Sequence, residues 1–272
     1  MDELRLDEDA LAGVLRGRGF GKTVYAFDTV DSTNLFAKSL ALRGLDGNDG
    51  TLVYAEHQTA GRGRWGRAWQ SSRGRGLIFS ILLRPPGRGG RIGGITLTAA
   101  TSVAQVIERN YDLRPKLLWP NDVTIGGRKI AGVLAETQRG RDGISFAVVG
   151  LGINVNQTES DFPAELAGKA GSIRMALSHP VDRLALMADL VIQLERDLRR
   201  LFSTGLEFAL NRWVRRNAIL GRTVTLKTRE GEARGRVKGF HADGSLILVR
   251  EDGKEKRFPD GEVVGVHHAS GH

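Results

Sequence analysis

The feature that most constrains the fold is a glycine- and arginine-rich segment, residues 61–67 (Gly-Arg-Gly-Arg-Trp-Gly-Arg). It lies between two apolar runs, residues 51–55 and 77–83, which have the length and composition of buried strands. Glycine lets the backbone approach a ligand closely, and arginine offers forked donors to carboxylates and phosphates. The pattern therefore predicts an anion-binding loop on an ordered sheet rather than part of a disordered tail.

The length and composition exclude several classes of protein. A chain of 272 residues can form one large domain with its own core and one small domain. It has no cysteine, which excludes disulfides, thiolate metal sites and cysteine nucleophiles. No apolar run approaches the roughly 20 residues that cross a bilayer, and the acidic N-terminus does not resemble a signal peptide. We therefore expect a cytoplasmic protein with no membrane partner.

The net charge of +9, from 40 basic and 31 acidic residues, is compatible with an anionic ligand or partner. Part of the excess is local, because five arginines lie between residues 62 and 75. The rest is dispersed along the chain, which is more typical of a solvated surface than of a nucleic-acid interface. A nucleic-acid-binding module, with the arginine loop and a basic β-domain, is nevertheless one alternative.

Hydrophobic periodicity predicts alternating groups of helices and strands in the first 218 residues. Capping residue types at positions 31–34 predict the start of one helix, and Gly126-Gly127 predicts the turn of a hairpin. Strands are expected at residues 23–27, 51–55, 77–83, 116–119, 123–125, 130–135 and 144–149. Helices are expected at residues 8–15, 35–42, 94–110, 182–201 and 206–217. This order favours an α+β fold, with a mixed, mostly antiparallel sheet and helices on one face.

The pattern changes near Ile219. Beyond it, Asp-Gly and Glu-Gly turns separate short strands expected at residues 223–228, 233–240, 245–250 and 256–258. Such spacing predicts a small all-β barrel. We therefore expect two domains, residues 1–218 and residues 219–272.

Several familiar catalytic motifs are missing. The sequence contains no P-loop, no Gly-x-Ser-x-Gly nucleophile elbow and no His-x-x-x-His pair on an expected helix. Residues 61–66 match the loose fingerprint Gly-x-Gly-x-x-Gly. We reject a dinucleotide site because arginines fill the intervening positions and no crossover helix to a parallel strand follows.

The remaining polar residues fit a nucleotidyl-transfer site, where two anionic reactants need cations to screen their repulsion. Taken singly, each has a simpler structural explanation as a turn, a hairpin tip or a strand-end cap, so only the joint pattern favours chemistry. The candidate cations are Arg62, Arg64, Arg67 and Lys129. The candidate polar residues at strand ends are Asn121, Asp122 and Asn154.

These motifs, in this order, resemble the biotin protein ligase family. The family pattern contains Asp-Ser-Thr-Asn, a Gln shortly before Gly-Arg-Gly-Arg-x-Gly-Arg, Lys-Trp-Pro-Asn-Asp, Arg-Lys-x-Ala-Gly-x-Leu-x-Glu and Gly-x-Gly-Ile-Asn. The chain carries the matching residues at positions 31–34, 58, 61–67, 119–122, 128–136 and 150–154. With the small β-domain, the resemblance spans nearly the whole chain.

The resemblance implies a class II synthetase-like catalytic domain followed by an SH3-like β-barrel. It also implies a two-step reaction. Biotin and ATP, with Mg²⁺, give biotinyl-5′-AMP and pyrophosphate, and a lysine of a biotin carboxyl carrier protein or domain then takes the biotin. No metal site built from side-chain clusters is expected. A monomer and a homodimer both remain open.

The resemblance also implies roles for individual residues. Biotin contacts are expected from Ser32, Thr33, Asn34, Gln58, Gly61, Arg62, Lys129 and Gly132. ATP or adenylate contacts are expected from Arg62, Gly63, Arg64, Arg67, Trp69, Asn121, Lys129 and Asn154. Catalytic roles are expected for Arg64, Lys129 and Asp122, the last in positioning or deprotonating the incoming lysine. The arginine loop would close over the adenylate and exclude water, with Trp65 or Trp69 as an apolar lid.

Two departures from the family pattern affect these expectations. Leu118 occupies the position of the usual lysine before Trp-Pro-Asn-Asp, and the nearest lysine is Lys116, on the same face of the expected strand. The residues before the first expected strand are too few for the DNA-binding domain of the repressor-type members, so we expect a ligase that does not bind DNA.

The nearest alternative is a lipoate–protein ligase, which shares the fold and the adenylate chemistry. The polar set Ser32, Thr33 and Gln58 suits a ureido ring better than a dithiolane.

Overall fold

The computed structural model describes residues 5–43, 49–70, 72–85, 92–139 and 145–267. A seven-stranded sheet is formed by β1 (Val24–Val30), β2 (Thr51–Gln58), β3 (Gly76–Leu83), β4 (Lys116–Leu118), β5 (Asp122–Ile125), β6 (Arg128–Arg139) and β7 (Ser145–Asn154). Its order is β1-β2-β3-β7-β6-β5-β4, and of its pairings only β1–β2 is parallel. The expectation of a mostly antiparallel sheet is confirmed.

The helices correspond to the expected apolar periodicities, except for the five-residue helix at Ile173–Leu177, which was not expected. They are α1 (Glu8–Val14), α2 (Thr33–Leu42), α3 (Ile92–Tyr111), α4 (Ile173–Leu177), α5 (Arg183–Thr204) and α6 (Glu207–Arg216). The longest, α5, begins after Asp182, whose carboxylate accepts hydrogen bonds from the first free backbone N–H groups of the helix. It ends at Gly205, which adopts a positive φ of 83°.

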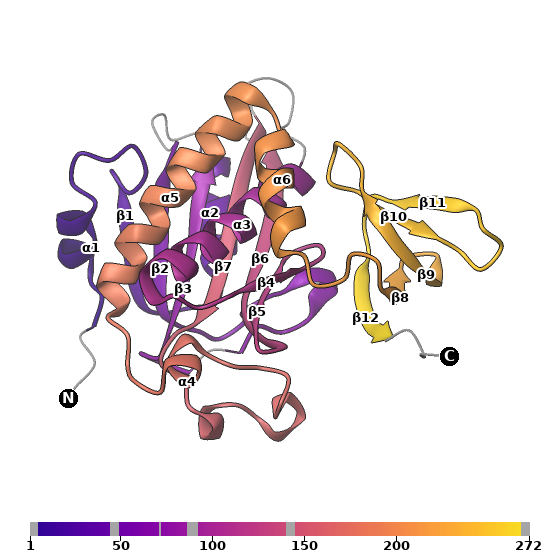
Figure 1. The fold of residues 1–272 in the computed structure, drawn as a ribbon. Helices are drawn as coiled ribbons and strands as arrows, with labels where there is room; N and C mark the ends of the chain where they lie inside the picture. The colour runs from indigo at the N-terminus through magenta and orange to yellow at the C-terminus, as the bar shows by residue number, and fades with distance from the viewer. Residues whose placement is uncertain (1–4, 44–48, 71, 86–91, 140–144, 268–272) are drawn as a thin grey trace.

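A smaller antiparallel sheet follows α6 and lies beside the large one in Figure 1. Its strands are β8 (Thr223–Thr228), β9 (Gly231–Phe240), β10 (Leu246–Val249), β11 (Glu255–Phe258) and β12 (Glu262–His267), in the order β11-β10-β9-β8-β12. The four strands expected from the sequence are present. The fifth, β12, was not expected, because its irregular pairing with β8 interrupts the alternation of apolar and polar residues. The domain boundary near Ile219 stays a prediction.

Strict alternation along the strands places two cores on opposite faces of the large sheet. Leu52 and Tyr54 of β2 belong to the larger core with residues of α3 and α5, whereas Val53 belongs to a smaller core with Ala37 and Leu40 of α2. The expectation of helices on one face therefore needs a correction, since α2 covers the opposite face. The error arose because β2, β3 and β7 are apolar on both sides, which no one-sided pattern reveals.

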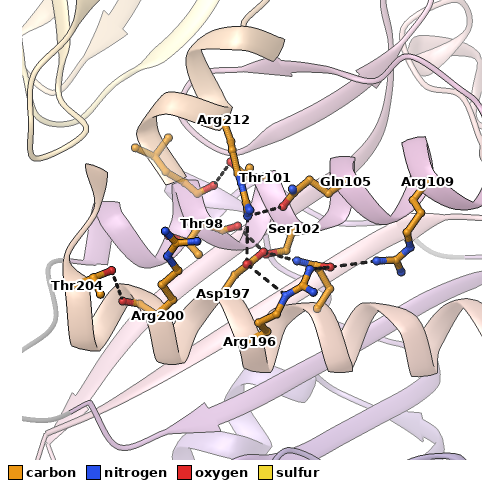
Figure 2. Close-up of polar contacts among 12 residues, drawn as sticks. Thr98, Thr101, Ser102, Gln105, Arg109, Arg196, Asp197, Arg200, Thr204 and Arg212 are labelled. Carbon is orange, nitrogen blue, oxygen red and sulfur yellow. Dashed lines mark hydrogen bonds and ion pairs between the residues drawn. The ribbon is translucent and has the colours of Figure 1, made fainter. Parts of the chain in front are cut away.

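A buried polar cluster joins α3, α5 and α6, as Figure 2 shows. The side chain of Asp197 in α5 is 4% exposed and accepts hydrogen bonds from Ser102 Oγ of α3 at 2.9 Å and Gln193 Nε2 at 2.6 Å. Arg212 Nη1 of α6 lies 3.3 Å from the same carboxylate. Because a buried carboxylate is stable only when it is paired, this cluster fixes the helix that leads into the small sheet.

Candidate active site

A cavity of about 520 Å³ lies on the α2 face of the large sheet. Ile78, Gly132 and Gly152 stand side by side on β3, β6 and β7 in its floor. The N-terminus of α2, the arginine loop and β12 contribute to its walls. One cavity thus collects residues from segments more than two hundred positions apart in the sequence.

Nearly all the residues expected at the site line this cavity. They are Ser32, Thr33, Asn34, Gln58, Arg62, Gly63, Arg64, Arg67, Trp69, Asn121, Asp122, Lys129, Gly132 and Asn154. Gly61 lies outside the lining, where its carbonyl accepts a hydrogen bond from Trp69 N at 2.9 Å. A Cβ atom at Gly61 would lie 2.5 Å from the carbonyl oxygen of Trp69, so Gly61 shapes the base of the loop.

The glycines of β6 and β7 make room for Trp69. A Cβ atom at Gly152 would lie 2.3 Å from the indole of Trp69, and one at Gly132 would lie 3.2 Å from it. The indole therefore rests on a stretch of sheet without side chains. Trp65, the other candidate lid, is 37% exposed and has a positive φ of 55°. Of the two tryptophans, Trp69 alone lines the cavity.

A buried polar recess lies where α2 begins. Ser32 is the N-cap of α2, but its hydroxyl makes no capping hydrogen bond and the residue lines the cavity. Thr33 N and Thr33 Oγ1 both donate to Gln58 Oε1, at 2.8 Å and 3.0 Å. The amide of Gln58 is held at the end of β2, so the expected biotin-binding residues Ser32, Thr33 and Gln58 lie together.

Two further residues of the recess were missed in the sequence. Ser80 of β3 is fully buried, with its hydroxyl 2.7 Å from Thr33 Oγ1 and 2.6 Å from Asn34 Oδ1. Glu136 of β6 accepts a hydrogen bond from Asn34 Nδ2 at 2.9 Å and pairs with Lys38. The one available signal for Ser80 was a hydroxyl in the middle of an otherwise apolar strand.

Lys129 lies on β6 rather than at the tip of the hairpin. Its ammonium is 2.7 Å from Asp122 Oδ1 and lies over the ring of Trp69, 5.7 Å from the centroid. Its backbone is held by hydrogen bonds to Lys169 and Gly171 on the segment that follows β7. The cation is thereby held at the floor of the cavity with one carboxylate beside it.

The arginine loop is held by the small sheet. Arg64 forms an ion pair with Asp260 and donates to the carbonyl oxygen of Gly261 at 2.7 Å, and Arg67 forms an ion pair with Glu262. The pKa of Arg64 lies below its ordinary value, because the effect of burial exceeds the opposing effect of the neighbouring carboxylates of Asp260 and Glu262. The contacts of the small sheet with this loop were not visible in the sequence, because they join residues almost two hundred positions apart.

The amides of Asn121 and Asn154 are engaged by the protein backbone. Asn121 Nδ2 donates to Val133 O at 2.9 Å, and Asn154 Nδ2 donates to Gly171 O at 3.0 Å. Both therefore brace the walls of the cavity. Gln157, which the sequence analysis missed, also lines it, and among the described residues its buried Oε1 has no hydrogen-bond partner.

Leu118 and Lys116, the lysine nearest to it in the sequence, differ in their relation to the cavity. Leu118 lines the cavity, whereas Lys116 is exposed at the edge strand β4 and is absent from the lining. The cations that line the cavity are contributed by the arginine loop, Lys129 and Lys169.

Within the described ranges, no three or more His, Asp or Glu side chains gather in a way that could hold a metal ion. None of the described helices combines the length and the apolar character needed to cross a membrane.

Comparison with known proteins identifies two regions. Residues 26–154 match the model of the biotin/lipoate A/B protein ligase family, and residues 219–264 match the biotin protein ligase C-terminal domain. The bifunctional ligase/repressor BirA of Bacillus subtilis is 32% identical over 93% of this chain and 78% of its own length. A biotin–[acetyl-CoA-carboxylase] ligase of Paracoccus denitrificans is 31% identical over 86% of this chain and 96% of its own.

A solved structure shows the same fold. The biotin protein ligase of Aquifex aeolicus in complex with biotin and ATP superposes with a TM-score of 0.78 at 29% identity, covering 91% of this chain and all of that one. With its motifs gathered in one cavity, its two matching regions and these relatives, the chain belongs to the biotin protein ligase family and is a biotin ligase enzyme.

Proposed function

We propose that this enzyme activates biotin as biotinyl-5′-AMP and transfers it to one lysine of a biotin carboxyl carrier protein or domain. The observation that carries the proposal is the single cavity, in which a buried hydroxyl–amide recess at α2 lies on the same sheet face as Lys129 and the arginine loop. The recess suits a ureido ring, and the cations suit a carboxylate and phosphates. The complex of the Aquifex relative with biotin and ATP supports this assignment.

In the proposed first step, the biotin carboxylate attacks the α-phosphorus of ATP, a P–O bond forms, and pyrophosphate leaves. Lys129, fixed on β6, would screen the repulsion between the two anions. Arg64 and Arg67 would cover the phosphates. Mg²⁺ would enter with ATP, bound by phosphate oxygens and water, which is its usual mode with nucleotides.

In the proposed second step, the amine of the carrier lysine attacks the acyl carbon of the mixed anhydride, and AMP leaves. Asp122 would hold or accept a proton of the attacking amine, and its position at the border of the cavity beside Lys129 supports this role. Trp69 over Gly152 would keep water from the anhydride.

We further propose that the enzyme does not act as a DNA-binding repressor. Support comes from the relative of Paracoccus denitrificans, which the chain matches over 96% of that protein's length and whose name describes a ligase only. Because the reaction consumes ATP, the cytoplasm is the compartment we propose for it. An electrophoretic shift of operator DNA by the protein with biotinyl-5′-AMP would contradict the first of these statements.

The test of the proposed function is the mass of an apo carrier domain after incubation with enzyme, ATP, Mg²⁺ and either biotin or lipoate. We expect one biotinyl group on one lysine, and no lipoyl group. Lipoyl transfer without biotinyl transfer would favour the lipoate–protein ligase alternative. Transfer of neither acid would contradict both assignments.

A further inference from the structure

The recess contains more acceptors than its hydroxyl hydrogens can satisfy. Ser80 Oγ is 2.6 Å from Asn34 Oδ1 and 2.7 Å from Thr33 Oγ1, yet a serine hydroxyl carries a single hydrogen. Thr33 Oγ1 itself donates to Gln58 Oε1. All four side chains belong to buried residues, so one acceptor next to Ser80 is short of a donor.

Whether an acceptor next to Ser80 lacks a donor depends on the orientation of the Asn34 amide, and the groups around this amide determine that orientation. The amide atom opposite Ser80 lies 2.9 Å from Glu136 Oε2 and 3.3 Å from the carbonyl oxygen of Leu134. A carboxylate and a carbonyl can only accept hydrogen bonds, so this atom is the nitrogen and the oxygen faces Ser80. Lys38 Nζ lies 2.5 Å from Glu136 Oε1 and stabilises the carboxylate that fixes the orientation of the Asn34 amide.

The reversed amide would remove the deficit. Asn34 Nδ2 would then donate to Ser80, and the Ser80 hydrogen would be free for Thr33. With the observed orientation, Asn34 Oδ1 can only accept, so the Ser80 hydrogen points to it and Thr33 Oγ1 is left as an open acceptor. Thr33 lines the cavity and Ser80 does not, so a ligand is the donor that can reach this oxygen.

We propose that Glu136 is a positioning residue that makes the recess select a head group carrying an N–H donor, because it fixes the Asn34 amide. The inference rests on the proposed function, since the ureido ring of biotin offers such a donor and a dithiolane does not. Glu136 acts through Asn34 and Ser80, and its own carboxylate is satisfied by protein groups.

The experiment is a double-mutant cycle read by calorimetric titration with biotin alone. Glu136→Gln keeps the size of the side chain but can donate as well as accept, so Asn34 is free to reverse. Thr33→Val removes the open acceptor. We expect Glu136→Gln to weaken biotin binding about tenfold with Thr33 present, which is the effect of about one hydrogen bond, and less than twofold in the Thr33→Val background.

Two further readouts separate positioning from general damage. With saturating biotin, the kcat of Glu136→Gln for carrier biotinylation should stay within about twofold of the unaltered enzyme, while KM for biotin rises about tenfold. The matched control is Glu159→Gln, which removes only an exposed ion pair with Arg128 and should change neither constant. Should Glu136→Gln fail to fold, biotin methylated on its ring nitrogens provides the test, and it should bind the unaltered protein at least about tenfold more weakly than biotin.

Equal losses in both backgrounds, or equal binding of biotin and the methylated analogue, would overturn this inference alone. Failure of the unaltered protein to bind biotin would overturn the proposed function and this inference together.

Discussion

The two halves of the cavity are built in different ways. The recess at α2 is made of buried side chains from α2, β2 and β3 and the half-buried Glu136 of β6, which are hydrogen-bonded to one another on one face of the large sheet. The arginine loop is a surface segment whose guanidinium groups are held by Asp260 and Glu262 of a second sheet. The first half is therefore preformed by the fold, whereas the second is assembled by contacts between two sheets.

This difference suggests how the work of the site is divided. A preformed recess binds a small, uncharged head group without reorganising, and so contributes to affinity and selectivity. A loop that is held by ion pairs can exchange its carboxylate partners for phosphates, and can close over a reactive intermediate. Lys129 belongs to the rigid sheet, and in the proposed reaction it would act on the phosphates, so it would connect the two halves.

The largest effect is expected where the halves meet. Lys129→Ala should reduce biotin-dependent exchange of pyrophosphate into ATP by about a hundredfold or more, because the cation at the reacting anions is lost. The control is Lys227→Ala, on the exposed side of β8. A reduction of less than about threefold would show that Lys129 does not act at the reacting groups.

The assembled half is tested by the double variant Asp260→Asn with Glu262→Gln. We expect KM for ATP to rise about tenfold, because Arg64 and Arg67 lose the contacts that hold them over the cavity. The dissociation constant for biotin should stay within about twofold. A fall in KM for ATP would mean instead that the two carboxylates compete with the phosphates.

The preformed half is tested by Ser80→Ala. Loss of the buried hydroxyl should raise the dissociation constant for biotin about fivefold and lower the free energy of unfolding by about 1 kcal/mol. Calorimetry and urea unfolding measure the two quantities. A rise in KM for ATP as large as the rise in the dissociation constant for biotin would contradict the separation of the recess from the arginine loop.

A smaller effect is expected at the departure from the family pattern. Leu118→Lys adds a cation to the cavity wall, so kcat/KM for ATP should rise by about twofold, while desolvation of the half-buried ammonium lowers the thermal midpoint slightly. Steady-state kinetics and a thermal melt measure the two changes. A rise of a hundredfold would show that the site is incomplete without this lysine.

The smallest effect concerns acid stability of the small sheet. Burial raises the pKa of Asp243, but hydrogen bonds from Ser245 and His241 and the charge of Arg257 outweigh it, and the net result is a pKa below the ordinary value. A depressed pKa stabilises the folded protein above the unfolded-state value near 3.9, and this contribution is lost as pH falls. The difference in unfolding free energy between the unaltered protein and Asp243→Asn should therefore shrink below about pH 4. A difference in unfolding free energy that stays constant with pH would show that Asp243 does not contribute to acid stability in this way.

Local sequence signals predicted the elements well where apolar periodicity and capping residues agreed, as in α5 behind Asp182. The joint pattern of motifs and the family resemblance, rather than any local signal, predicted which motifs would meet. Local signals could not predict Ser80 as part of the site, since one polar residue in a strand does not reveal its neighbours. Gln157 lies in the irregular segment after β7, and Glu136 ends the matched motif 128–136 but was given no role there. The ion pair between Arg64 and Asp260 depends on how the two sheets pack against each other, and no local sequence pattern predicts that packing.

The most direct test of the central difference is hydrogen–deuterium exchange of the free enzyme and of the enzyme with biotin and ATP. We predict strong protection of the β2, β3 and β6 peptides around the recess without any ligand. We predict weak protection of residues 61–70 in the free enzyme and a large increase with both substrates. Strong protection of both regions in the free enzyme, or equal gains in both on binding, would contradict the division into a preformed and an assembled half.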